Sequence, residues 1–97
     1  MSSKTPAGTI NKENLYLKEF GQSLKNLRVN YAQKSLRIFA YETDVPCATL
    51  SRIENGLRIP NIIILKRIAA GFDWTVEELI TNIEKNISDE FKTFDVL

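Results

Sequence analysis

The chain has 97 residues, of which 43% are hydrophobic and 26% charged, and these values are typical of one globular domain. It contains no histidine and one cysteine, so histidine-based catalytic triads, most zinc sites and a disulfide within the chain are excluded. No stretch approaches the roughly 18 apolar residues of a membrane span, and no signal-peptide pattern opens the chain. We therefore expect a cytoplasmic protein that is not an enzyme and has no metal, cofactor, membrane contact or evident small-molecule ligand.

The first nine residues, MSSKTPAGT, are small and polar and include Pro and Gly, so a flexible arm is expected at 1–9 and a single domain at 10–97. A helix is expected from about Asn14 to Asn30. Its apolar residues repeat at spacings of three and four, which indicates one buried face: Leu17, Phe20, Leu24, Leu27 and Tyr31.

Residues 35–60 predict two short helices joined by a tight turn. The first begins after Ser35, a good N-cap residue, and ends near Thr43. The second spans about 46–55 and is followed by Gly56, which takes the left-handed conformation of a helix C-cap without steric cost. This is the pattern of a helix-turn-helix, whose second helix lies in the major groove of DNA.

Two more helices are expected downstream. Asn61 can cap a helix that runs to about Ala70, and Thr75 with Glu78 forms a capping box that opens the next. Apolar residues then continue at spacings of mostly three and four as far as Phe94. Either this helix extends towards Phe94, or it breaks near 86–88 and a short further helix follows. No segment alternates as a strand would, so the expected fold class is all-α.

The net charge of +1 is unevenly distributed. Residues 1–60 carry +4 and residues 61–97 carry −3. This uneven distribution of charge is typical of a protein that places one face against phosphate groups. The alternative explanation is chance, because the number of charged residues is small.

The helix pair resembles the Cro and phage-repressor type of helix-turn-helix, the XRE family, which includes restriction-modification controllers. The resemblance covers about residues 18–80. Its matching positions are Ala40, Val45, Leu50, the run Ile53-Glu54-Asn55-Gly56, Pro60, an upstream Phe20-Gly21-x-x-Leu24-x-x-Leu27-Arg28 and downstream Leu65, Ile68, Ala69, Trp74, Thr75, Glu78 and Leu79. It implies a lambda-repressor-like five-helix DNA-binding domain, here with an extended C-terminal helix.

The resemblance also assigns candidate DNA contacts. On the predicted helix 46–55, Leu50 and Ile53 point inward and the opposite side is exposed. The candidate base-contacting residues are Cys47, Ala48, Thr49, Ser51 and Arg52. Arg52 is the strongest of them, because a guanidinium can bond guanine O6 and N7 together. Leu36, Cys47 and Ala48 depart from the polar residues that many family members carry, so part of the specificity is expected from DNA shape and deformability.

Phosphate contacts are expected from the residues that flank this helix. They are Ser35, Arg37, Asn55 and Arg58, with the backbone amides of Leu57 to Ile59. The resemblance further implies a partly buried structural ion pair between Arg28 and Glu54. The connection 29–34 is one residue longer than is usual in the family.

The resemblance implies a homodimer that regulates transcription, as repressor or activator, from a pseudo-palindromic operator in double-stranded DNA. We expect its interface at an apolar stripe made of Ile80, Ile83, Ile87, Phe91 and Phe94. The alternative is that this segment folds back on the first or fourth helix. The second functional class is a protein-interaction adaptor that keeps the fold without tight DNA binding.

Overall fold

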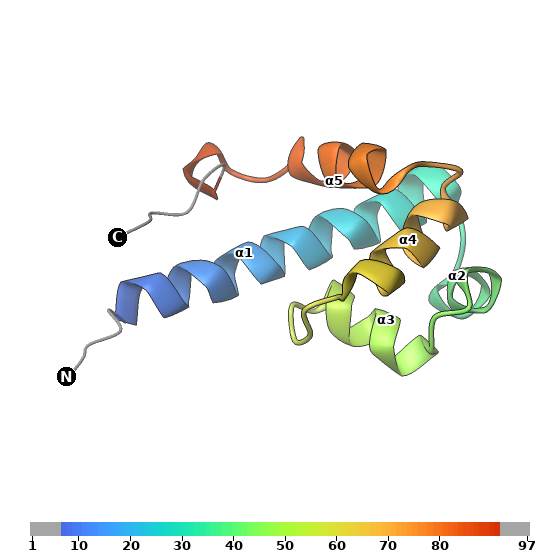
Figure 1. Cartoon of the computed structure of the whole chain (residues 1–97), viewed down its shortest axis with the longest axis horizontal. Helices are drawn as coiled ribbons and strands as arrows, with labels where there is room; N and C mark the ends of the chain where they lie inside the picture. The colour runs from blue at the N-terminus through green and yellow to red at the C-terminus, as the bar shows by residue number, and fades with distance from the viewer. Residues whose placement is uncertain (1–6, 92–97) are drawn as a thin grey trace.

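The structure is a computed structural model that describes residues 7–91, and within that range the chain is helical with no strand. Figure 1 shows a long first helix with the other helices gathered around its second half. The elements are α1 (Ala7–Asn26), η1 (Leu27–Ala32), α2 (Leu36–Thr43), α3 (Cys47–Glu54), α4 (Ile62–Gly71), α5 (Val76–Glu84) and η2 (Asp89–Phe91). The predicted all-α, five-helix architecture is confirmed.

Helix α1 begins earlier than the sequence indicates. It starts at Ala7, so the prediction of an arm over 1–9 is wrong for residues 7–9, and residues 1–6 lie outside the described range. At its other end the helix widens into the π-helical segment η1, which ends at Gln33 with a left-handed φ of 56°. A π turn holds one residue more than an α turn. The additional residue of this connection therefore fits into a wider helical turn.

The core lies between all five α-helices. The largest side chains that are fully buried are Phe39, Leu24, Leu50, Ile53, Ile68, Leu79 and Ile83. Phe39 and Ala40 face inward from α2. Rings of Phe39, Phe72 and Trp74 pack in succession, with centroids 4.9 and 4.6 Å apart, and they join α2 to the α4–α5 turn. None of the helices within residues 7–91 is long and apolar enough to cross a membrane.

Side-chain caps fix where the helices begin. The Ile38 amide donates to Ser35 Oγ at 3.2 Å, and the Ile64 amide donates to Asn61 Oδ1 at 2.8 Å. Thr75 and Glu78 form the predicted capping box at the start of α5. These three predicted caps are confirmed, and they place α2, α4 and α5 within a residue of the expected starts.

The C-terminal segment folds back along α1 (Figure 1). Helix α5 ends at Glu84 and the short η2 follows. The sequence left two alternatives for this segment. The break near 86–88 is confirmed, and the prediction of one helix that extends towards Phe94 is wrong. The Ser23 hydroxyl donates to the Ile83 carbonyl at 2.7 Å, and the Tyr16 hydroxyl donates to Glu84 Oε2 at 2.7 Å. The rings of Tyr16 and Phe91 meet edge to face at 6.2 Å.

This packing corrects the predicted dimer stripe. Ile83, Ile87 and Phe91 are buried within the single chain, with exposed fractions of 0%, 9% and 4%. Ile80 is partly buried against the same core, and Phe94 lies outside the described residues. The physical reason is the length of α1, which extends beyond the other core helices and provides its own apolar surface to the stripe.

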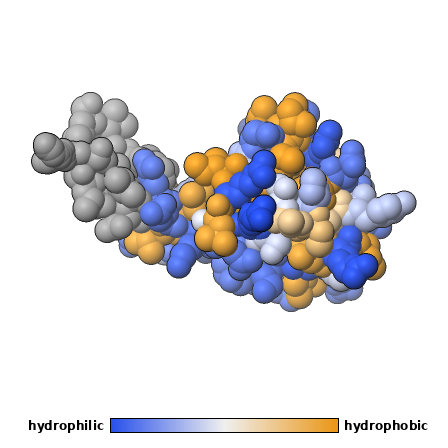
Figure 2. Space-filling view, turned by 90° about the horizontal axis from the view of Figure 1, so that it is seen from below, coloured by the Kyte–Doolittle hydropathy of each residue, from blue (hydrophilic) through white to orange (hydrophobic). Residues whose placement is uncertain are grey.

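Other hydrophobic side chains are exposed instead. Figure 2 views the molecule from the side on which α3 lies, and it shows hydrophobic surface directly beside strongly hydrophilic surface. The segment between α3 and α4 and the first turn of α4 contribute four aliphatic side chains that are each more than half exposed: Leu57, Ile59, Ile62 and Ile63.

Candidate nucleic-acid interface

Helix α3 is packed closely against α1. A Cβ atom added to Gly21 would lie 2.4 Å from the carbonyl oxygens of Ile53 and Glu54. That distance is far inside van der Waals contact, so the two backbones approach here only because residue 21 has no side chain. Gly21 therefore fixes the position of the C-terminal end of α3 on the body of the protein.

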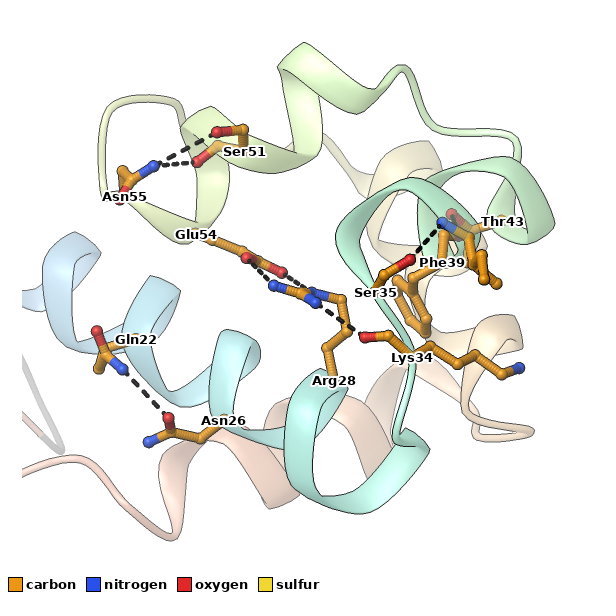
Figure 3. A network of polar contacts seen from close by, with 11 residues as sticks. Gln22, Asn26, Arg28, Lys34, Ser35, Phe39, Thr43, Ser51, Glu54 and Asn55 are labelled. Carbon is orange, nitrogen blue, oxygen red and sulfur yellow. Dashed lines mark hydrogen bonds and ion pairs between the residues drawn. The ribbon is translucent and has the colours of Figure 1, made fainter.

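A buried ion pair holds the same end of α3 (Figure 3). Arg28 Nε and Nη2 donate to the two carboxylate oxygens of Glu54 at 2.7 and 2.9 Å, and Arg28 Nη1 donates to the Lys34 carbonyl at 2.9 Å. Both side chains are about 95% buried. The predicted structural pair is confirmed, and η1 carries the arginine that reaches it.

Helix α3 ends in a Schellman motif. The Gly56 amide donates to the Ile53 carbonyl at 3.1 Å and the Leu57 amide donates to the Arg52 carbonyl at 2.8 Å, while Gly56 has a left-handed φ of 74°. The predicted glycine cap is therefore confirmed. The Leu57 amide is occupied by this cap, which argues against its predicted role as a phosphate donor.

The exposed side of α3 carries most of the predicted base-contacting residues. Cys47, Ala48 and Arg52 are exposed, and Ser51 is half-buried. Thr49 is only 8% exposed, so less of its side chain is available to a base than the sequence predicts. Position 49 is one residue, about 100°, from the inward-facing Leu50, so it lies at the flank of the exposed side, and the packing of α3 on the core buries it.

The predicted phosphate contacts surround this helix. Arg37 on α2 and Arg58 in the following loop are exposed. The Ser35 hydroxyl is also exposed, and an oxygen that accepts the Ile38 amide can still donate its own proton. Asn55 is exposed, and its side-chain nitrogen donates one hydrogen to the Ser51 carbonyl at 2.8 Å and lies 3.5 Å from Ser51 Oγ (Figure 3). Its second N–H is the group of this side chain that can donate to a phosphate, since the amide oxygen only accepts.

The charge of this surface is positive. Between Cys47 and Asn61 the only carboxylate is Glu54, which is buried against Arg28, while Arg52 and Arg58 are exposed. Helix α3 also begins without a side-chain cap, since its N-cap residue is Pro46. DNA phosphates and base edges accept hydrogen bonds. Arginine side chains and the free amides at the start of a helix can donate them.

A hollow of about 730 Å³ adjoins the start of α3. It is lined by Arg37, Ala40, Tyr41, Asp44, Val45, Pro46, Cys47 and Arg67. Arg67 comes from α4, outside the helix-turn-helix, and its Nη1 donates to the Asp44 carbonyl at 3.1 Å. Sequence reasoning missed this residue because no short-range pattern links position 67 to the turn 23 residues before it.

No metal site is evident in the part of the chain that the structure describes, since it contains no cluster of three His, Cys, Asp or Glu side chains. The arrangement is suited to binding an extended anion: a rigidly held helix with exposed arginine beside it and no exposed carboxylate along it.

The chain is similar to a known regulatory protein. The chain is 39% identical over 66 residues to Control protein C.MunI from Mycoplasma sp, and the match covers 68% of this chain and 89% of that protein. No protein-family model matches the chain, and no solved structure gives a significant match.

Proposed function

Because the chain belongs to the XRE-type helix-turn-helix family of restriction-modification control proteins, we propose that it binds a specific duplex DNA site as a homodimer and regulates transcription there. The similarity to a control protein supports the regulatory role. The proposal adds to this role a sequence-specific operator and a homodimer.

The observation that carries the proposal is the combination of a fixed α3 and its exposed arginines. The Arg28–Glu54 pair and the Gly21 contact hold the C-terminal end of α3 on the core. Arg52 and Arg58 then extend from a segment with no exposed carboxylate. A helix that is held rigidly and bears exposed cations can enter the major groove with its phosphate contacts already in place.

Two subunits are needed for specificity, because one domain of this size reads too few base pairs to select one site among many. Two copies related by a two-fold axis place their recognition helices about one turn of DNA, roughly 34 Å, apart. The operator is then a pseudo-palindrome.

We place the dimer contact at the exposed aliphatic group Leu57, Ile59, Ile62 and Ile63, with a second copy of this chain as the occupant. Ile83, Ile87 and Phe91 of the predicted C-terminal stripe are buried within their own chain, which argues against a contact through them. The aliphatic group follows α3 directly in the chain. A two-fold axis that passes beside this group and points towards the exposed side of α3 leaves both copies of α3 on the same side of the dimer, as one DNA duplex requires.

The interface is tested by replacing Ile63 with Asp. The expected result is a lower sedimentation mass and weaker binding to the operator, because a charge in an apolar contact is desolvated without a partner. Val29→Asp is the matched control, since Val29 is also exposed but lies on η1. A dimer that withstands Ile63→Asp, or a wild-type protein that is monomeric at tens of micromolar, would contradict this interface.

The DNA-binding proposal is tested by measuring affinity for the DNA upstream of the protein's own gene and for random duplex at several salt concentrations. Each phosphate that the protein neutralises lowers the logarithm of the affinity by about 0.9 per decade of salt. We expect a steep salt dependence and a preference for the upstream DNA.

The adaptor is the second candidate, and Cys47 and Ala48 favour it, because neither is a strong hydrogen-bonding group for a base edge. Absence of binding to any duplex at micromolar protein would support the adaptor and contradict DNA regulation.

A further inference from the structure

We propose that Arg67 of α4, together with Arg37 of α2, binds a phosphate of the DNA backbone at the hollow beside the start of α3. This inference rests on the proposed DNA binding and adds to it a contact from outside the helix-turn-helix.

The hollow brings together three donor side chains from separate parts of the chain. Arg37 and Tyr41 are four residues apart on α2 and thus share one face of that helix, and Arg67 reaches the hollow from α4. Tyr41 is 87% exposed, so its hydroxyl is available to a ligand. Guanidinium and hydroxyl groups that line one hollow are suited to an oxyanion.

The two arginines have no carboxylate partner among residues 7–91, where the ion pairs are Arg28–Glu54 and Lys34–Glu42. Asp44 is the one acidic residue that lines the hollow, and the contact with Arg67 is made by its backbone carbonyl. Two guanidinium groups against one carboxylate leave a net positive charge. An anion that entered the hollow would compensate this charge.

Arg67 keeps donors for such a ligand. A guanidinium has five N–H groups, and one of them bonds the Asp44 carbonyl. That bond also orients the side chain, which lowers the entropy cost of holding a phosphate. A planar fork that is already anchored on one side can thus offer its other edge to two phosphate oxygens.

The location of the hollow identifies the anion as a DNA phosphate. The hollow contains Cys47, the first residue of α3, and Arg37, the second residue of α2. When the exposed side of α3 lies in the major groove, the backbone at the edge of that groove passes the ends of both helices. Arg67 then adds a contact to the strand that Arg37 already faces.

The experiment compares Arg67→Ala with Lys66→Ala, which removes the same charge from the adjacent, exposed position outside the hollow. Binding to upstream and random duplexes is measured across a salt series. Arg67→Ala should lower the affinity for both duplexes by a similar factor of about ten. It should also flatten the salt slope by about 0.9 per subunit. Lys66→Ala should leave the slope unchanged.

Two further variants address folding. Arg67→Lys should retain the wild-type salt slope, because the cation is kept. Arg67→Gln should flatten the slope as Arg67→Ala does, while a hydrogen bond to the Asp44 carbonyl is still possible. The melting temperature of each variant shows whether the contact of residue 67 with the turn between α2 and α3 is needed for stability. A flattened slope in Arg67→Gln with an unchanged melting temperature supports the phosphate contact.

Other outcomes overturn the inference. If the Arg67 variants lose preference for upstream DNA and melt earlier while the salt slope stays constant, Arg67 only positions the turn. If Arg67→Ala binds as wild type does while Arg58→Ala flattens the slope, the hollow holds no phosphate although the DNA-binding proposal stands. If the wild-type protein binds no duplex, the proposed function itself fails.

Discussion

Arg28 and Glu54, 26 residues apart, form a two-pronged ion pair with N–O distances of 2.7 and 2.9 Å at the C-terminal end of α3. The pair joins η1, which follows the long first helix, to the last residue of α3. It also takes Glu54 out of the surface that would face DNA, so the pair orients α3 and removes its only carboxylate from the interface. One contact thus holds α3 in place and also leaves the exposed side of α3 without a negative charge.

Replacing Arg28 with Ala should destabilise the protein by about 3–5 kcal/mol, because Glu54 is left buried without a partner. The free energy of unfolding in denaturant measures the change. Lys34→Ala is the control, since the Lys34–Glu42 pair is much more exposed and such pairs contribute about 0–1 kcal/mol. Equal losses in the two variants would contradict a specific role for the buried pair.

Replacing Gly21 with Ala should also destabilise the protein, by about 1–3 kcal/mol, because the new methyl group overlaps the carbonyls of Ile53 and Glu54. Alanine inside a helix is otherwise favoured over glycine by about 1 kcal/mol. A net loss in chemical denaturation therefore isolates the contact between α1 and α3. Lys25→Ala on the exposed side of α1 serves as the control, and a Gly21→Ala protein as stable as wild type would refute the tight crossing.

Arg52 and Arg58 should affect DNA binding in different ways. Arg52→Ala is expected to cost about 1–3 kcal/mol on the upstream DNA and to relax the preference at one position in each half-site. Arg58→Ala should weaken all sequences similarly and flatten the salt slope. Competition with operator variants separates the two effects. If Arg52→Ala lowers the affinity for operator and random DNA equally, Arg52 contacts phosphate and not a base.

Ile83 should behave as a core residue and not as an interface residue. It is fully buried between α5 and α1, so Ile83→Ala should reduce the free energy of unfolding by about 2–5 kcal/mol. Ile63→Ala, at a position that is 54% exposed, should change the stability of the monomer by about 0.5 kcal/mol or less. Dissociation of a dimer without loss of monomer stability in Ile83→Ala would restore the C-terminal stripe as the interface.

Tyr16 should make stability depend on pH in the alkaline range. Burial, and next the hydrogen bond to Glu84, raise the pKa of Tyr16 well above its usual value of about 10. The folded state then keeps the phenol proton where the unfolded state has lost it. Stability from this group is complete below pH 10 and falls as the pH rises above it. The fall between pH 10 and 11.5 should be smaller in Tyr16→Phe, and an unchanged slope in that variant would be evidence against the shift.

Short-range information determined much of the fold. The caps at Ser35, Asn61, Thr75 and Gly56 depend on residues within five positions of each other. A cap satisfies backbone groups that a helix end leaves unbonded, so the residue type at one position is enough to predict the boundary. The exposed positions of Cys47, Ala48 and Arg52 likewise follow from the 100° rotation per residue of a single helix.

The sequence by itself therefore determined the helices, the turn between α2 and α3, and the candidate DNA-binding helix. Only the tertiary structure decided the packing of the C-terminal segment on α1, the burial of Thr49 and the position of Arg67 beside Asp44. The apolar spacing of Ile83, Ile87 and Phe91 shows that these residues need a partner but not which surface provides it. That choice depends on how far α1 extends and how closely Gly21 lets α3 approach it, which are distances between segments remote in the chain.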